Sequence, residues 1–263
     1  MFERIGVVPF RGTIRERTVE PYVRLLRALR DRPAVRGVLI DISSGGGEST
    51  ASMDLHLAIR RLDAITPVFV SIGAAAASGA YLAAVGARRI FAYPESAVGS
   101  IGVVMPHLAV RDLLAKLGIS VELLHEGRHK DAYQGVRPLT EEERGKLQGI
   151  LREDYDRFVA VVAEARHRPV EQIRELATGE FWSGQTALKL GLVDAMGDRE
   201  MALAALADEV KVPVGRAVTF SPPRPWLERV LGTSSAIGGD RNLLARLREA
   251  AEDAILAEWI GLR

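Results

Sequence analysis

The sequence has 263 residues, which is long enough to bury one substantial α/β core. Its formal net charge is +1, and acidic and basic residues are interspersed, so it lacks the basic patch that nucleic-acid binding needs. There are no cysteines, which excludes disulfides, thiolate-ligated metals and cysteine nucleophiles. Any nucleophile must therefore carry oxygen or nitrogen, and no nucleic-acid partner is expected.

The sequence contains no membrane-span signal. No stretch reaches the roughly 18 to 20 apolar residues that a span needs, because Arg, Asp or Glu interrupts every apolar run. Residues Met1 to Arg4 lead directly into an apolar run, without the basic start and long apolar region of a secretion signal. We expect a soluble, cytoplasmic protein with no integral span, which would meet membranes only through partners or through a trimmed anchor.

Between residues 5 and 92, short apolar runs alternate with helical periodicity. The apolar runs predict buried strands, and apolar residues spaced at helical intervals predict amphipathic helices. This alternation indicates parallel strand pairing through right-handed crossovers, so we expect an α/β fold. The predicted strands span 5–10, 37–42, 67–72 and 89–92. The predicted helices span 21–30 and 49–62.

Beyond residue 92 the patterns favour helices. A helix is predicted over 108–117, a short strand over 121–124 and a long helix over 140–166. Thr140 and Glu143 have the spacing of a capping box, which places the start of the long helix.

The end of the chain has a different composition. Segment 213–225 holds four prolines and no periodicity, which indicates a linker or extended arm. The apolar residues after it mark one face of a terminal helix, which we expect to pack on the core or on a neighbouring subunit. These residues are Leu243, Leu244, Leu247, Ala251, Ile255 and Trp259.

Ser78 is a candidate nucleophile because of where it lies. A run of small residues over 73–84 follows the third predicted strand and begins a helix near Ser78. At such a transition a hydroxyl can stand clear of the sheet, and the helix amino end adds positive potential. A serine that opens an alanine-rich helix is more often a cap, so the position alone leaves both interpretations open.

Glycines near Ser78 could supply an oxyanion hole. Gly79 offers a backbone amide with no side chain to block a substrate, and the Gly45-Gly46-Gly47 loop could add a second amide at the carboxyl end of the neighbouring strand. Three consecutive glycines are also common in simple turns. They do not form a phosphate loop, because neither nucleotide-binding glycine string occurs in the chain.

Few residues could act as the general base. Of the 35 basic residues only five are lysines, and arginine cannot surrender its proton. Lys130 follows a predicted strand end, where it could project into a cleft and lose its hydration shell. Burial lowers a lysine pKa and so gives a base usable near neutral pH, although a solvated loop charge is the alternative interpretation. The other lysines are Lys116, Lys146, Lys189 and Lys211.

Several motifs follow one another in order between residues 5 and 200. They are the glycine loop within 37–47, Ala-Ser-Gly within 68–81, Val-Gly-Ser-Ile-Gly-Val at 98–103, Glu-Gly-Arg-His-Lys-Asp at 126–131, and the segments 139–144 and 181–194. Together they resemble the signal peptide peptidase A family, a family of serine peptidases (S49). The family usually has Asn-Ser-Pro-Gly-Gly where this chain has Ser-Ser-Gly-Gly-Gly at 43–47.

The resemblance implies a Clp protease-like or crotonase-like fold of repeated βαβ units. The peptidase domain would span 1–211, and 212–263 would form the proline-rich arm and C-terminal helices. It also implies a ring-shaped or dome-shaped homo-oligomer that hydrolyses peptides or unfolded and membrane-derived segments, without a cofactor or a metal.

The resemblance also assigns roles to site residues. Ser78 corresponds to the nucleophile and Lys130 to the general base of a Ser-Lys dyad. The amides of Gly79 and of either Gly46 or Gly47 correspond to the oxyanion donors. The apolar residues over 101–105 suggest small or hydrophobic side chains before the scissile bond.

Three alternatives remain at this point. The related Clp proteases use a Ser-His-Asp triad whose histidine would follow Val98, where this chain has Gly-Ser-Ile at 99–101. His107 comes too late for that role, and His129 lies beside Lys130 as a possible neighbour of the site. A crotonase-type acyl-CoA enzyme would use the same two amides with carboxylates as acid and base. An inactive scaffold would bind peptides without hydrolysing them.

Overall fold

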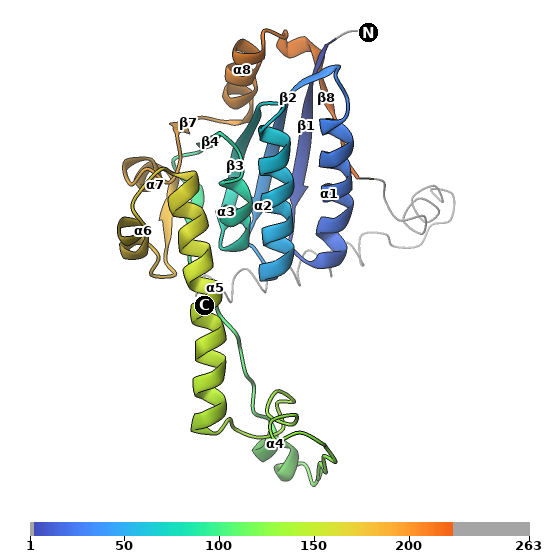
Figure 1. The fold of residues 1–263 in the computed structure, drawn as a ribbon, viewed down its shortest axis with the longest axis vertical. Helices are drawn as coiled ribbons and strands as arrows, with labels where there is room; N and C mark the ends of the chain where they lie inside the picture. Colours follow the sequence, from blue (N-terminus) through green and yellow to red (C-terminus); the bar gives the residue numbers. More distant parts are fainter. Residues whose placement is uncertain (1–2, 223–263) are drawn as a thin grey trace, which may run out of the picture.

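The computed structural model describes residues 3–222 of the protein, and Figure 1 shows their arrangement. Within them eight strands form one sheet, in which β6-β5-β3-β2-β1-β8 lie side by side and β4 pairs with β3 and β7. The strands are β1 (Arg4–Arg11), β2 (Val35–Ser44), β3 (Val68–Ala77), β4 (Arg89–Ala92), β5 (Ala97–Gly99), β6 (Phe181–Ser183), β7 (Ala195–Met196) and β8 (Ala217–Thr219). The helices are α1 (Glu16–Arg30), α2 (Ser49–Asp63), α3 (Gly79–Ala84), α4 (Arg111–Lys116), α5 (Glu141–Ala165), α6 (Val170–Leu176), α7 (Gly184–Lys189), α8 (Arg199–Val210) and the short 3-10 helix η1 (Val214–Arg216).

The first strands of the sheet are parallel, as the sequence predicted. β1 pairs with β2, β2 with β3 and β3 with β4, all in parallel. The crossovers run through α1 and α2, which lie on one face of the sheet with α3, whereas α8 packs on β2 and β3 (Figure 1). The carboxyl ends of β2 and β3 therefore meet at one edge, which is where ligands gather in such sheets.

Two apolar cores lie on opposite faces of the sheet. Val38 and Ile40 of β2 belong to the core under α1, α2 and α3, whereas Leu39 between them packs with Leu206 of α8. Successive side chains of a strand point to opposite faces, so a strand buried on both sides is apolar throughout. This explains why 37–42 is a continuous apolar run.

Two predicted elements differ from the structure. β3 continues to Ala77 instead of ending at residue 72, because the alanines pair with Ser44 of β2 and with β5. The strand predicted over 121–124 does not form, since no neighbouring strand is there to accept its backbone hydrogen bonds. An isolated apolar run is therefore not enough to make a strand.

The segment after α8 also differs from the prediction of a linker or extended arm. Its described part contains η1 and β8, and β8 adds a strand beside β1, with Ala217 opposite Ile5. The Phe220 amide extends this pairing by donating to the Val7 carbonyl oxygen at 2.8 Å. Residues 223–263, including the predicted terminal helix, lie outside the described residues. The domain boundary at 211/212 stays a prediction.

Residues 103–140, which we call the arm, project from the sheet beside the amino-terminal part of α5 (Figure 1). α4 lies in the arm and has no buried residue. Ala132 is the one residue of the arm that is fully buried. The arm therefore has almost no core of its own. None of the helices within 3–222 combines the length and apolar character that crossing a membrane requires.

His56 of α2 is a buried histidine that packs against α3. It is 2% exposed, its Nδ1 lies 2.9 Å from the carbonyl oxygen of Leu82, and its Nε2 has no hydrogen-bond partner among the described residues. Burial is the largest influence on the pKa of His56 and lowers it. Arg60 lowers the pKa further, while the bond to Leu82 and the charge of Glu164 oppose the shift.

The lowered pKa of His56 makes stability depend on pH. Above its ordinary value of 6.5 the histidine is neutral in both the folded and unfolded states. As pH falls below 6.5, the unfolded state binds a proton that the folded state resists, so the free energy of unfolding falls by at most about 1.4 kcal/mol per pH unit. Denaturant titrations between pH 7.5 and 5.5 should show a smaller loss in His56→Gln than in the natural protein.

The control is His167→Asn, because His167 is exposed and its backbone has φ 51°, which Asn tolerates. This variant should keep the pH dependence of the natural protein. An unchanged pH dependence in His56→Gln would show that burial of this histidine does not matter to stability.

Candidate active site

Ser78 occupies a strained turn between β3 and α3. Its backbone angles are φ 51° and ψ −126°, a conformation that costs energy for any residue with a Cβ. Its amide donates to the carbonyl oxygen of Gly99 at 2.7 Å, while its hydroxyl has no hydrogen-bond partner among the described residues. The side chain therefore does not cap α3, and the hydroxyl is free to meet a ligand.

A cavity of about 210 Å³ opens beside Ser78. Its walls come from the glycine loop after β2, from α2, α3 and α5, and from the segment that follows β5. The apolar side chains that line it are Met53, Leu82, Val103 and Phe158. The charged side chains that line it are Asp54, Asp154 and Arg157. Ser78 thus faces a mainly apolar space with charges on its walls.

Gly79 must be a glycine for this turn to pack. A Cβ placed on Gly79 would lie 2.0 Å from Ser52 Oγ, 2.8 Å from Ser52 Cβ and 3.5 Å from the amide nitrogen of Gly47. Ser52 is fully buried in α2, and its hydroxyl donates to the carbonyl oxygen of Glu48 at 2.8 Å, so it has little room to move. The absence of a side chain at Gly79 lets the nucleophile turn and α2 approach each other.

The glycine loop also packs closely, with Gly46 against the Ser78 turn and Gly47 against Ile14. A Cβ on Gly46 would lie 2.8 Å from the amide nitrogen of Gly79, and one on Gly47 would lie 1.9 Å from the carbonyl oxygen of Ile14. Both glycines have positive φ, 98° at Gly46 and 155° at Gly47. The structure therefore places Gly46, Gly47 and Gly79 close to Ser78.

The structure places Lys130 elsewhere. Lys130 is exposed in the arm and does not line the Ser78 cavity. Its neighbours are tied to the first turn of α5, since Arg128 pairs with Glu142 at 2.8 Å. At a helical rise of ~1.5 Å per residue, the first residue of α5 is about 20 Å from Asp154, which does line the cavity. Ser78 and Lys130 do not meet within one chain.

The two histidines considered for a triad also lie in the arm. Nε2 of His107 is 3.1 Å from the carbonyl oxygen of Arg137, and Nε2 of His129 is 2.7 Å from Nζ of Lys146. Neither lines the cavity, so neither forms a triad with Ser78 within the chain. No group of three or more His, Asp or Glu side chains within residues 3–222 is arranged to hold a metal ion.

The sequence did not identify the walls of the cavity. Asp154, Arg157 and Phe158 reach it from the middle of α5, which no local motif links to Ser78. Ser52 of α2, which also lines the cavity, was not identified either. Its position a few residues after the glycine loop could have suggested it. Of the apolar run at 101–105, Val103 lines the cavity together with the neighbouring Gly102, while Ile101 is buried in the core.

The packing at Gly79 can be tested by adding one methyl group. We expect Gly79→Ala to lower the free energy of unfolding in a denaturant titration, because the new Cβ overlaps Ser52. Adding Ser52→Gly should recover part of the loss. The matched control is Gly145→Ala on α5, where a Cβ meets no atom within 4 Å, and it should be neutral or stabilising by up to about 1 kcal/mol. Equal stability of Gly79→Ala and the natural protein would contradict the close packing.

Comparison with solved structures places the fold among Clp-type proteases. A variant of ClpP1 from Listeria monocytogenes superposes with a TM-score of 0.51 over 74% of this chain and 93% of that chain, at 17% identity. A variant of the membrane-bound stomatin-specific protease 1510-N gives a TM-score of 0.54 over 85% of this chain and 100% of that chain, also at 17% identity. The fold is therefore Clp protease-like, as the sequence resemblance implied.

Sequence comparison defines the family. A relative from Methanocaldococcus jannaschii is 40% identical over 185 residues, which is 70% of this chain and 60% of that protein. A relative from Synechocystis is 32% identical over 242 residues, 89% of this chain and 85% of that protein. The chloroplastic serine protease SPPA of Arabidopsis thaliana is 32% identical over 256 residues, 92% of this chain but 38% of that protein.

The chain thus spans less than two thirds of the first and third of these relatives. Residues 60–213, which include Ser78, Lys130 and the walls that α5 contributes, match the model of Peptidase family S49. The chain belongs to Peptidase family S49.

Proposed function

We propose that this protein is a serine endopeptidase that cleaves peptides through an acyl-enzyme formed on Ser78. The observation that carries the proposal is the free hydroxyl of Ser78, which a strained turn presents to a cavity beside the glycine loop and Gly79. Strained backbone at a functional site positions a reactive group before the substrate arrives. Membership in Peptidase family S49 supports the same chemistry.

In the proposed reaction Ser78 Oγ attacks the scissile carbonyl carbon while Lys130 Nζ takes the hydroxyl proton. Collapse of the tetrahedral intermediate breaks the C–N bond, and the ammonium of Lys130 returns the proton to the leaving amine. Water then attacks the acyl-enzyme with Lys130 again as base. The second product leaves as a carboxylic acid, and Ser78 is regenerated.

The two amides that we propose as oxyanion donors are those of Gly47 and Gly79. The amide of Gly46 is already used, because it donates to Ser44 Oγ at 3.1 Å. The Gly47 amide has no acceptor among the described residues. Gly79 is the first residue of α3, so its N–H has no acceptor within the helix. Two free amides beside one serine hydroxyl match what acyl transfer requires.

We propose that Lys130 comes from the arm of a neighbouring copy. Within one chain Lys130 lies in the arm beside the first turn of α5, and that turn is about 20 Å along the helix from Asp154 in the cavity wall. The arm also exposes apolar side chains that a partner would cover, among them Leu124 (91% exposed), Leu108 (77%) and Val104 (72%). An arm that docks on the next copy forms a head-to-tail contact, and such contacts form a ring when the rotation between copies closes.

The residues that line the cavity indicate which substrate side chain would fit beside Ser78. Met53, Leu82, Val103 and Phe158 offer an apolar surface next to Ser78, which suits a small or hydrophobic side chain before the scissile bond. Peptides and unfolded segments expose such side chains to a peptidase, and we propose them as substrates.

A second candidate function has one observation in its favour. A crotonase-type acyl-CoA enzyme would use the same two amides with carboxylates as acid and base, and Asp54 and Asp154 line the cavity. Such an enzyme would not need the Ser78 hydroxyl. A fluorophosphonate probe separates the two functions, because it labels an activated serine: labelling of Ser78 supports the peptidase, and its absence at any pH supports the acyl-CoA enzyme or an inactive scaffold.

Mixing two inactive variants tests both the dyad and its origin. Ser78→Ala and Lys130→Ala should each lower the hydrolysis of a fluorogenic peptide library by more than about a thousandfold. After 1:1 mixing and reassembly, about one quarter of the sites would pair an intact serine with an intact lysine from another copy, so about a quarter of the natural activity should return.

The control is each variant taken alone through the same dissociation and reassembly. Full activity in Ser78→Ala would show that Ser78 is not the nucleophile. Inactive variants that never complement each other, although mixed oligomers form, would show that serine and lysine act within one chain.

A further inference from the structure

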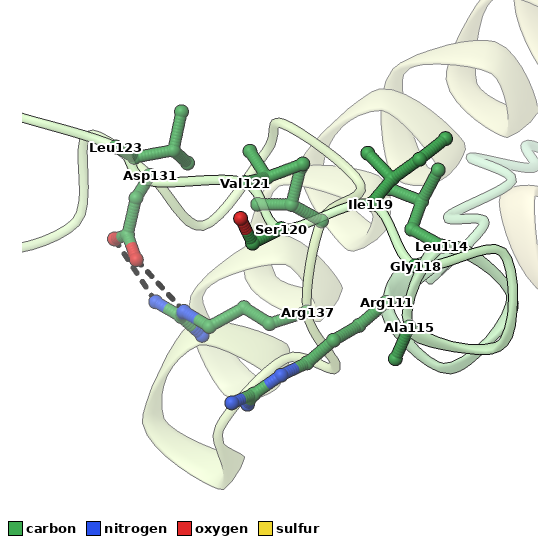
Figure 2. A pocket seen from close by; sticks show the side chains of 11 residues that line it. Arg111, Leu114, Ala115, Gly118, Ile119, Ser120, Val121, Leu123, Asp131 and Arg137 are labelled. Atoms are coloured by element: carbon green, nitrogen blue, oxygen red, sulfur yellow. Dashed lines mark hydrogen bonds and ion pairs between the residues drawn. The ribbon is translucent and has the colours of Figure 1, made fainter.

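Arg137 lies in the arm just before α5 begins, and it bonds two carboxylates from different segments. Its Nε and Nη2 donate to the two oxygens of Asp131 at 2.8 and 3.0 Å, and its Nη1 and Nη2 donate to the two oxygens of Glu143 at 2.9 and 2.8 Å. Figure 2 shows the hydrogen bonds between Arg137 and Asp131, with Arg111 and Leu114 of α4 nearby. We call Arg137, Asp131 and Glu143 the arginine clamp.

The clamp is anchored in the first turn of α5. The side chain of Glu143 is 3% exposed, and it also accepts from the Thr140 amide at 2.9 Å in the capping box that begins α5. The bonds to Arg137 lower the pKa of the Asp131 carboxyl and are the largest influence on that of Glu143, which is also lowered. Glu143 of α5 therefore fixes the Arg137 guanidinium, which in turn fixes the Asp131 carboxylate.

Lys130 stands next to the residue that the clamp holds. Its amide donates to the carbonyl oxygen of Gly127 at 3.0 Å, in a turn where Gly127 has φ 95°. On its other side come Asp131 and then Ala132, the one fully buried residue of the arm. The backbone of Lys130 is thus fixed on both sides, while its side chain is left free to project.

We propose that Arg137 is a positioning residue for Lys130, which aims the lysine amine by fixing Asp131 against the start of α5. The proposal rests on the proposed function, because it gives Lys130 the role of general base. A guanidinium suits this task, since its planar donors can bond two carboxylates at once. Apolar packing alone cannot fix the loop that carries Lys130, because the arm has almost no buried residues.

The clamp also balances charge beside Lys130. Arg137 offsets the charges of Asp131 and Glu143, and without it both carboxylates would favour the ammonium form of a nearby lysine. The other charged or titratable groups around the clamp are His107, Arg111, His125, Arg128, His129, Glu142 and Lys146. They are the same in every variant below, so differences between variants report on the clamp.

Two substitutions should shift the pH profile in opposite directions. In Arg137→Gln we expect kcat to fall about 10- to 100-fold with KM nearly unchanged, because a misplaced catalytic group loses rate while the substrate cavity is intact. The acid limb of the kcat/KM profile should move to higher pH. In Asp131→Asn we expect a fall in kcat with the acid limb moved to lower pH, because one carboxylate is lost.

Arg137→Lys should restore the position of the acid limb but only part of kcat, because a single ammonium cannot bond both carboxylates in the same geometry. The matched control is Arg144→Gln, which removes an exposed arginine paired with Glu141 at the same helix start and should behave as the natural protein. Light scattering and circular dichroism check assembly and folding. If Arg137→Gln does not assemble, Asp131→Asn and Arg137→Lys still test the proposal.

Lys130→Ala in the same assay separates the two hypotheses. If Lys130→Ala retains natural activity, the proposed function is wrong. If Lys130→Ala is inactive while Arg137→Gln keeps the natural kcat and pH profile, Lys130 is required but Arg137 does not position it, and the proposal for the clamp is refuted. Losses of kcat without opposite pH shifts in Arg137→Gln and Asp131→Asn would indicate a purely structural role and would also refute it.

Discussion

The contact between the glycine loop after β2 and the turn at Ser78 is the constraint on which the site depends. A Cβ on Gly46 would lie 2.7 Å from the carbonyl oxygen of Ala77, and one on Gly79 would lie 2.0 Å from Ser52 Oγ. Any side chain there would separate the loop from the turn, and with it the amides from the hydroxyl. The strained φ of Ser78 persists because a buried strand precedes it and a fully buried helix follows it.

The chain divides the proposed chemistry between two regions of very different burial. The sheet and its helices hold the nucleophile and the amides, and every residue of α3 is buried. The arm holds the lysine, and no residue of α4 is buried. A rigid core can keep a strained turn in place, whereas an arm with little core needs charged contacts and a neighbour to acquire a fixed geometry. In our proposal a free chain therefore carries the nucleophile without its base, and assembly completes the site.

The sequence predicted what local patterns determine. Apolar runs located β1, β2 and β4, the capping box at Thr140 placed the start of α5, and small residues marked the turn at Ser78. It failed where the outcome depends on distant partners. The run at 121–124 found no neighbouring strand, and α5 brings Asp154 and Phe158 to the cavity from a segment that no motif connects to Ser78. The separation of Ser78 and Lys130 was equally hidden, because the order of motifs along the chain does not show which end of α5 lies beside each of them.

A structure of the assembled protein, with Ser78 carrying a fluorophosphonate adduct, tests the shared site most directly. The quantity to measure is the distance from each Ser78 Oγ to the nearest Lys130 Nζ. We expect a lysine of the adjacent copy at about 3 Å, within hydrogen-bonding reach. An active assembly in which every Lys130 lies beyond that reach of every Ser78, or an active monomer that keeps the separation seen in this chain, would contradict the proposal.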